Sequence, residues 1–185
     1  EAQNLLKRVH GGAVLEESSH SEMRIPFIIR ELEQSNAKIT MAQKAADWVQ
    51  DGDVVMLDAS SSAYSMIPFL SNKSQLTVIT SGVKTLIKLG EYHIPVFSTG
   101  GELLPTCFSL VGEEAYQMIS HYNADIVFFS CRGLSPDGMA TDFSVEENLV
   151  RQKMMHRARK KVLLCDSKKF DKKFMHTLCR IQDID

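Results

Sequence analysis

Five short apolar runs recur along the chain, and they limit its fold more than any other feature. They lie within 51–58 (DGDVVMLD) and at Leu76–Thr80, Ile94–Ser98, Asp125–Ser130 and Lys161–Cys165. Each is apolar at consecutive positions and rich in Val, Ile or Phe, which is typical of strands buried on both faces. Helical patterns separate most of the runs. The sequence therefore predicts an α/β fold with a mainly parallel sheet and helices on both of its faces.

The segments between the runs show helical spacing. We expect helices over 21–35, from Asn36 onward, and at Val83–Leu89, Leu110–His121 and Val145–Ala158. Pro26 must then lie in a first helical turn, and Pro68 should shorten or kink the helix after the first run. Residues 1–20 are expected to be irregular and polar. No repeat or linker divides 21–185, which we expect to form one domain.

Composition excludes several classes of protein. The chain has 185 residues, of which 44% are hydrophobic and 24% charged, as in soluble globular domains. It has no apolar run near the roughly 18 residues of a membrane span and no signal-peptide pattern, so we expect a cytoplasmic protein. The four cysteines form no CxxC pair, and the six histidines form no HxxxH pair. We therefore expect reduced cysteines, no metal and no cofactor.

Charge is distributed unevenly along the chain. Residues 1–150 carry 10 Lys and Arg against 19 Asp and Glu, whereas residues 151–185 carry 11 against 4. A basic C-terminal segment could attract a phosphate or a nucleic acid. The run RARKK at 157–161 has a plainer interpretation, because it closes a predicted helix, where cations suit the helix dipole. The sequence leaves open whether this run serves a ligand, an interface or solubility.

Small polar residues follow the first predicted strand, where Asp58 precedes Ser60, Ser61 and Ser62. In open parallel α/β sheets ligands bind outside the carboxyl ends of the strands, and small residues let backbone N–H groups approach an anion. The loop is not a Walker loop, because GxxxxGK[ST] is absent. It can hold a phosphate. Alternatively, its serines only cap the next helix, and Asp58 accepts hydrogen bonds from the backbone.

The other strand ends have a similar character. They carry Thr80 and Ser81 after the second run, Gly100 and Gly101 after the third, Arg132 after the fourth, and Asp166, Ser167, Lys168 and Lys169 after the fifth. A double glycine permits a sharp turn or close contact with a ligand, and an arginine can clamp an anion. Five strand ends that are small, hydroxylated or basic favour a phosphorylated sugar or polyol as the ligand.

An enzyme is an alternative to a binding protein. Isomerisation of a sugar phosphate needs a carboxylate base and a group that stabilises the enediolate. The candidate bases are Asp58, Asp125, Asp166, Glu146 and Glu147, and Lys169 is a candidate electrophile or phosphate partner. No spacing singles out one acid–base pair. A third possibility is an assembly module whose polar strand ends bind nothing.

Several segments arrive in an order and spacing that resemble one known family. The effector-binding domain of DeoR-type transcriptional regulators resembles this chain at GDVVMLDASSS, VITSGVKTL, STGGELL with SLVG, ADIVFFSCRGLSPDGMATDFSVEENLVRQKMM and VLLCDSKKF. The segment RVHGGAV (Arg8–Val14) resembles the exit from the family's N-terminal winged helix-turn-helix. The resemblance implies a Rossmann-like fold shared with ribose-5-phosphate isomerase and CoA transferases, and it does not imply catalysis.

The family's motifs correspond to residues of this chain one by one. Its DxGTT loop falls on Asp58–Ser62, with Ser60 in place of the glycine. Its TN pair falls on Thr80 and Ser81, and its double glycine on Gly100 and Gly101. Glu147 matches the acidic residue of the long helix, with Arg151 as the basic residue after it, and Lys169 matches the lysine of the DxSK ending, in which Lys168 replaces the serine.

The resemblance also implies roles and partners. Ser60–Ser62, Thr80, Ser81 and Lys169 are expected to hold a phosphate, and Asp58, Arg132 and Glu147 to face sugar hydroxyls. The chain is then a sensor of a phosphorylated sugar or polyol in a repressor of sugar metabolism genes, and it assembles into a homo-oligomer such as a dimer or tetramer. DNA would be bound only by a winged helix before Arg8. Residues 1–20 are then the tail of a linker, and 21–185 the sensor domain.

Overall fold

A five-stranded sheet forms the centre of the computed structural model, which describes residues 6–9, 12–15, 25–32 and 36–185. The strand order is β11-β8-β3-β4-β5, and every neighbouring pair is parallel. The strands are β3 (Val54–Leu57), β4 (Thr77–Thr80), β5 (Val96–Ser98), β8 (Ala124–Ser130) and β11 (Ala158–Leu164). The predicted parallel sheet is confirmed, with one strand at each of the five apolar runs.

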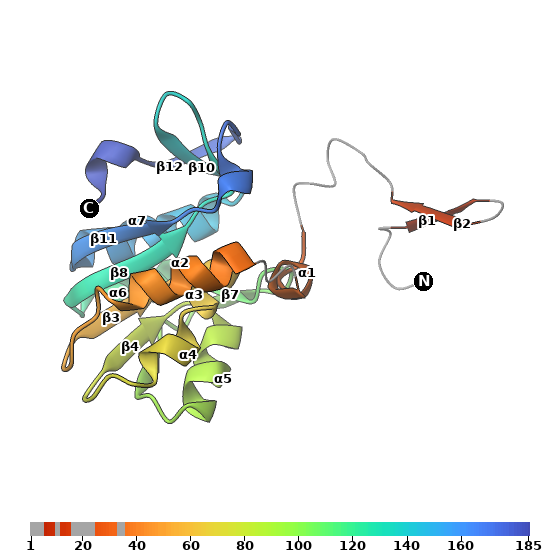
Figure 1. Ribbon diagram of the computed structural model, residues 1–185. Coiled ribbons are helices and arrows are strands. Elements are labelled where there is room, and N and C mark those ends of the chain that lie inside the picture. Colours follow the sequence, from red (N-terminus) through yellow and green to blue (C-terminus); the bar gives the residue numbers. More distant parts are fainter. Residues whose placement is uncertain (1–5, 10–11, 16–24, 33–35) are drawn as a thin grey trace.

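Helices cover both faces of this sheet (Figure 1). One face carries α2 (Asn36–Ala46), α3 (Ser61–Tyr64), α4 (Ile67–Leu70) and α5 (Val83–Glu91). The other face carries α6 (Glu113–Ser120) and α7 (Val145–Arg157). A short helix, α1 (Phe27–Leu32), lies beside α3 at one end of the sheet (Figure 1). The expected two-layer covering is therefore confirmed.

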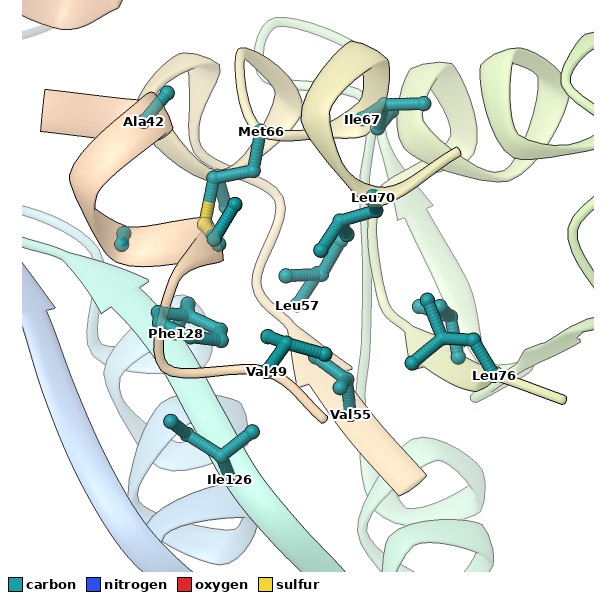
Figure 2. Packing of buried hydrophobic residues seen from close by; sticks show 14 of the residues in the cluster. Ala42, Val49, Val55, Leu57, Met66, Ile67, Leu70, Leu76, Ile126 and Phe128 are labelled. Carbon is teal, nitrogen blue, oxygen red and sulfur yellow. The ribbon is translucent and has the colours of Figure 1, made fainter. Parts of the chain in front are cut away.

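Alternate residues of the central strands enter two separate hydrophobic cores. Leu57 and Phe128 pack with Leu70 beneath the α2–α5 layer (Figure 2). Met56 and Phe129, their neighbours in the chain, pack under α6 and α7 instead. All five side chains are fully buried, and burying a side chain of this size stabilises a fold by about 1.5–3 kcal/mol. Two cores explain why the runs are apolar at every position and not at alternate ones.

Three small antiparallel sheets were not predicted. The strands β6 (Glu102–Leu104) and β7 (Ser109–Val111) form one, and β1 (Leu6–Val9) and β2 (Gly12–Leu15) form another. The third joins β12 (His176–Arg180), β10 (Met139–Asp142) and β9 (Gly133–Leu134). Their strands have two to five residues and mixed polarity, so they lack the continuous apolar pattern of the main sheet.

Two expected segments differ from the structure near the chain start and before α6. Irregular structure over 1–20 is wrong for β1 and β2, and the rest of 1–20 lies outside the described residues. The helix expected from Leu110 begins only at Glu113, because Leu110 and Val111 pair with β6.

The two prolines act at helix starts. The carbonyl of Pro26 accepts hydrogen bonds from the amides of Ile29 and Arg30, so α1 begins directly after it, while 21–24 and 33–35 lie outside the described residues. Pro68 is the second residue of α4, which is separated from α3 by a break. The predicted interruption near Pro68 is confirmed.

Only Arg157 of the basic run at 157–161 closes a helix, whereas one interpretation placed the whole run at a helix end. The helix α7 ends at Arg157, and the next residues begin β11, an edge strand of the sheet. Arg159 lies 3.1 Å from the carboxylate of Asp125, and the ammonium of Lys160 lies 5.7 Å from the ring centre of Trp48. Charged side chains of this kind protect an exposed sheet edge from pairing with other chains.

The cysteines are free, and Cys131 and Cys179 are buried. Over the residues that the structure describes, no helix is long and apolar enough to cross a membrane. The same residues contain no group of three His, Cys, Asp or Glu side chains placed to hold a metal ion.

Candidate functional site

A cleft of about 340 Å³ opens at the carboxyl ends of β3, β8 and β11, the edge where ligands of parallel sheets bind. Its sheet side is formed by Ser60–Ser62, Ser130–Arg132 and Asp166–Lys169, each of which follows or ends a strand. Ile25 and Arg30, together with Ala37 and Lys38 of α2, also line the cleft. Asp142, Arg151 and Lys172 complete the lining. We call this site the basic cleft.

The lining of the basic cleft is strongly cationic. Seven lining residues are basic, and they are Arg30, Lys38, Arg132, Arg151, Lys168, Lys169 and Lys172. Only two of the described lining residues, Asp142 and Asp166, are acidic. Because residues from four separate parts of the chain supply these charges, the overall charge of −2 gives no sign of this concentration.

Asp58 does not line the basic cleft, and its carboxylate contacts the backbone of the loop after β3. Its Oδ1 accepts a hydrogen bond from the amide of Ser60 at 3.1 Å. Its Oδ2 accepts one from the amide of Ser130 at 3.1 Å and one from Nε of Arg151 at 2.9 Å. The carboxylate thus ties the loop after β3 to the end of β8. The interpretation that Asp58 accepts hydrogen bonds from the backbone is confirmed.

Arg151 of α7 is the counter-charge for this buried carboxylate. Its Nη1 donates to Asp142 Oδ2 at 2.8 Å and to Asn148 Oδ1 at 3.1 Å, and its Nη2 lies 3.6 Å from Glu147 Oε1. Burial alone lowers the pKa of Arg151. The carboxylates of Asp142, Glu147 and Asp58 together raise this pKa by more than burial lowers it, so the net shift is upward. Three carboxylates therefore hold this guanidinium in its charged form.

The three serines divide into one capping residue and two further lining residues. The hydroxyl of Ser60 accepts a hydrogen bond from the amide of Ala63 at 3.1 Å and caps α3. The capping interpretation is therefore confirmed for Ser60. Ser61 and Ser62 also lie in α3, are buried, and line the basic cleft.

Lys169 reaches the same cleft from the short 3-10 helix Ser167–Lys169. Its ammonium donates to the hydroxyl of Ser130 at 2.6 Å, and that hydroxyl donates to the carbonyl of Leu164 at 2.6 Å. The carboxylate of Asp166 lies 3.9 Å from the ammonium, at the limit of an ion pair. The lysine is thus held at the end of β8 by a neutral hydroxyl and a weakly engaged carboxylate.

Arg132 and Arg30 form the side of the cleft nearest α1. Nη2 of Arg132 donates to the carbonyl of Ile25 at 3.4 Å. Nε and Nη2 of Arg30 are buried without a hydrogen-bond partner in the described structure. Burial and the positive charge of Arg132 lower the pKa of Arg30 to about 10. Sequence reasoning missed Arg30, whose only signal is a cation within the apolar segment PFIIREL.

Thr80 and Ser81 were expected to hold phosphate, but they do not line the basic cleft. The Thr80 hydroxyl accepts from the amide of Gly82 at 3.0 Å, and the Ser81 carbonyl accepts from the amide of Leu110 at 2.7 Å. Both residues are buried and connect β4 to its neighbours. Their predicted contact with a ligand stays a prediction.

The double glycine makes a turn and a close backbone contact, and neither glycine lines the basic cleft. Gly100 has φ +64° and Gly101 has φ +99°, which are left-handed conformations that favour glycine. A Cβ on Gly101 would lie 2.3 Å from the carbonyl oxygen of Val111 in β7. The need for glycine at 101 therefore comes from β7.

Glu147 lines a second cleft, of about 490 Å³, which we call the adjoining cleft. Thr106, Cys107 and His176 also line it. Ile25, Arg132 and Asp142 line both clefts, so the two share a boundary. A ligand that crosses this boundary meets a cationic part and a part with hydroxyl and carboxylate groups.

Comparison with known proteins identifies the family and supports the fold. Residues 33–185 match the family described as the DeoR C terminal sensor domain. The transcriptional regulator GolR of Listeria innocua is 36% identical over 171 residues, which cover 91% of this chain and 66% of that protein. The lactose phosphotransferase system repressor of Staphylococcus epidermidis is 30% identical, and the match covers all of this chain and 73% of that protein. The chain therefore spans about two thirds to three quarters of these relatives.

A solved structure supports the fold. Ribose 5-phosphate isomerase A of Methanocaldococcus jannaschii superposes with a TM-score of 0.55 over 73% of this chain and 54% of that one. The sequence identity is 18%, so this likeness concerns the fold alone and confirms the expected isomerase-like sheet. The family match over 33–185 and the identity to two named regulators show that this chain belongs to the DeoR-type transcriptional regulators and contains their C-terminal sensor domain.

Proposed function

We propose that this domain senses a phosphorylated sugar or polyol, which it binds in the basic cleft. The observation that supports the proposal is the excess of seven basic over two acidic lining residues at the carboxyl ends of three parallel strands. A phosphate ester near pH 7 carries close to two negative charges and three acceptor oxygens. Such a group offsets the repulsion among the cations and accepts hydrogen bonds from lysine, arginine and hydroxyl donors.

The residues take distinct parts in this proposal. The hydroxyls of Ser61 and Ser62, the ammonium of Lys169 and the guanidinium of Arg132 bind the phosphate from the sheet side. The carbon chain and hydroxyls of the ligand extend past Arg132 into the adjoining cleft, where Glu147 accepts hydrogen bonds. Asp58 acts through Ser60 and Ser130, whose amides it holds, and so positions the loop.

Regulation is the proposed outcome of binding. The relative from Staphylococcus epidermidis is named as a repressor of a lactose phosphotransferase system, which supports a role in controlling sugar metabolism. We place DNA binding in an N-terminal winged helix of the cytoplasmic regulator and assembly into a homo-oligomer in this domain. The effector favours one arrangement of domains or subunits, because a ligand shifts an equilibrium only through its differential affinity. Oligomer mass with and without effector tests this step, and identical assemblies at saturation would contradict it.

The isomerase alternative has weaker support. An isomerase needs a carboxylate that is free to take a proton from the substrate. Asp58 accepts hydrogen bonds from three donors, and Glu147 lies in the adjoining cleft, 3.6 Å from Arg151. A turnover assay with pentose and hexose phosphates separates the two functions. Turnover that disappears in Glu147→Gln would favour the enzyme.

A thermal-shift screen tests the proposal directly. The panel contains glycerol 3-phosphate, pentose 5-phosphates and hexose phosphates, each beside its unphosphorylated form. A ligand at about 100 times its Kd stabilises the fold by about 2.7 kcal/mol. We expect a shift with one phosphorylated compound and none with its unphosphorylated form.

Two variants and a matched control locate the site. Ser61→Ala or Lys169→Ala should abolish the shift, because both side chains line the basic cleft. Ser71→Ala should retain it, because that exposed hydroxyl donates to the carbonyl of Pro68 and does not line the cleft. A full panel without any shift would contradict the proposed function.

A further inference from the structure

Among the described residues that line the basic cleft, Arg30 is the one whose side chain has buried nitrogens without a hydrogen-bond partner. Its Nε and Nη2 have no hydrogen-bond partner. Its guanidinium carbon lies 5.6 Å from the ring centre of Phe27, a contact between the cation and the ring. Such a contact cannot replace the hydrogen bonds that the buried N–H groups lose when they leave water.

The surroundings of Arg30 increase this deficit. Arg132 and Lys38 line the same cleft, and the ammonium of Lys38 donates to the carbonyl of Arg30 at 2.8 Å. No salt bridge of Arg30 occurs among the described residues. With a pKa of about 10, Arg30 remains a cation at neutral pH. An anion in the cleft would supply the acceptors that the described residues do not.

The helix that carries Arg30 is attached to the domain by few contacts. Phe27 is its only buried residue, and its ring meets Tyr64 at 5.6 Å and Phe108 at 6.4 Å between ring centres. The amide of Phe27 donates to the carbonyl of Thr106 at 3.0 Å. A six-residue helix with one buried side chain is among the segments that open most readily. Additional contacts through Arg30 should therefore measurably change the fraction of molecules in which α1 is docked on the domain.

We propose that Arg30 is an effector-contacting residue, whose unpartnered N–H groups bind the same anion as Ser61 and Lys169, so that the ligand fastens α1 to the sheet. The inference rests on the proposed function and adds to it a binding residue and a path of regulation. Because α1 precedes the five-stranded sheet in the chain, a ligand that fixes α1 also restrains the segment that comes before it. The ligand prefers the state with α1 docked, and it shifts the equilibrium by that difference in affinity.

The test uses inorganic phosphate and the sugar phosphate that shifts the wild type most. Their affinities are measured by calorimetry for the wild type, Arg30→Met, Arg30→Lys and the control Arg159→Met, whose side chain is 76% exposed and pairs with Asp125. Arg30→Met should lower the affinity for the sugar phosphate about tenfold or more, as expected for a lost hydrogen bond to a charged group. Arg30→Lys should recover part of the affinity, and Arg159→Met should match the wild type.

Two further readouts separate a ligand contact from a structural role. Unliganded Arg30→Met should be at least as stable as the wild type, because it removes a buried cation with unsatisfied N–H groups. The amides of Ile29 and Arg30, which bond to the carbonyl of Pro26, should exchange more slowly when the sugar phosphate is added to the wild type. In Arg30→Met this protection should be absent.

The failures are distinguishable. If the wild type binds a sugar phosphate and Arg30→Met binds it equally well, the role of Arg30 is overturned, while the sensor function stands. If the wild type binds neither phosphate nor any sugar phosphate, the proposed function and this inference are both overturned.

Discussion

Two arginines of the basic cleft differ in how their buried nitrogens are bonded. Arg151 donates to Asp58, Asp142 and Asn148 at 2.8–3.1 Å. Arg30, in α1, has two buried nitrogens without a partner in the described structure. A buried charge with partners stabilises one arrangement of the chain, whereas a buried charge without them costs stability. The contrast identifies Arg151 as part of the scaffold and supports Arg30 as a residue kept for binding.

The Arg151 network explains how a cleft made of loops keeps its shape. Asp58 accepts hydrogen bonds from the amides of Ser60 and Ser130, which lie 70 positions apart in the sequence. Asp142 joins β10 to the same guanidinium. One cation therefore connects the ends of β3 and β8, the strand β10 and the helix α7. The Arg151 network positions the side chains that we propose bind the ligand, but those side chains are not part of the network.

The largest effect is expected for Arg151→Met. The substitution leaves Asp58 and Asp142 buried without their counter-charge, and breaking a buried ion pair in this way costs about 3–5 kcal/mol. Urea denaturation measures the change in the free energy of unfolding. The control Arg159→Met removes a side chain that is 76% exposed and should change stability by less than about 0.5 kcal/mol. Equal changes in the two variants would show that the network is not part of the scaffold.

A smaller effect is expected for Asp142→Asn. Arg151 keeps Asp58, and the new amide still offers an oxygen to either Arg151 or the amide of Phe143, so we expect a loss of about 1–3 kcal/mol. The same denaturation series gives the value. Asp137→Asn is the matched control, because Asp137 is 58% exposed and pairs with Lys173 at the surface. A loss as large as that of Arg151→Met would mean that Asp142 is the main counter-charge.

The smallest effect on stability is expected for Lys169→Met. Ser130 keeps its hydrogen bond to the carbonyl of Leu164, so the unliganded domain should lose less than about 1 kcal/mol. The rise in melting temperature with the effector should nevertheless be lost. Lys173→Met, at a lysine that is 62% exposed and does not line the basic cleft, should keep that rise. An unchanged rise in Lys169→Met would remove Lys169 from the ligand side of the comparison.

The parallel sheet could be predicted because its cause lies in local sequence. Residues such as Met56 and Leu57 enter different cores, so both must be apolar, and a consecutive apolar run is visible without any structure. The position of Ser61, Ser62, Arg132 and Lys169 at one edge also follows, because parallel strands place their carboxyl ends together. The small sheets were missed because pairing between two or three residues leaves no periodic pattern.

The contacts of Asp58, Thr80, Gly101 and Arg30 depend on tertiary structure, and the sequence predicted ligand contacts for the first three only. Asp58 follows a strand as a ligand-binding residue would, yet its carboxylate accepts hydrogen bonds from Ser130 and Arg151, which are 72 and 93 positions away. Gly101 looks suited to a ligand, but its close contact is the carbonyl of Val111. Arg30 has no sequence signal beyond being the one cation in a mainly apolar helix.

The division between the two levels has one physical reason. Periodicity, strand composition and the residues after each strand are properties of neighbouring positions, and they were sufficient for the fold class and for the edge of the sheet that holds the cleft. The family was suggested by the resemblance of its motifs, in order and spacing, to segments of this chain. The pairing of a buried charge depends on which distant carboxylate reaches it, and folding alone decides that distance. Whether an arginine is satisfied, as Arg151 is, or lacks partners for its buried nitrogens, as Arg30 does, is therefore known only from the tertiary structure.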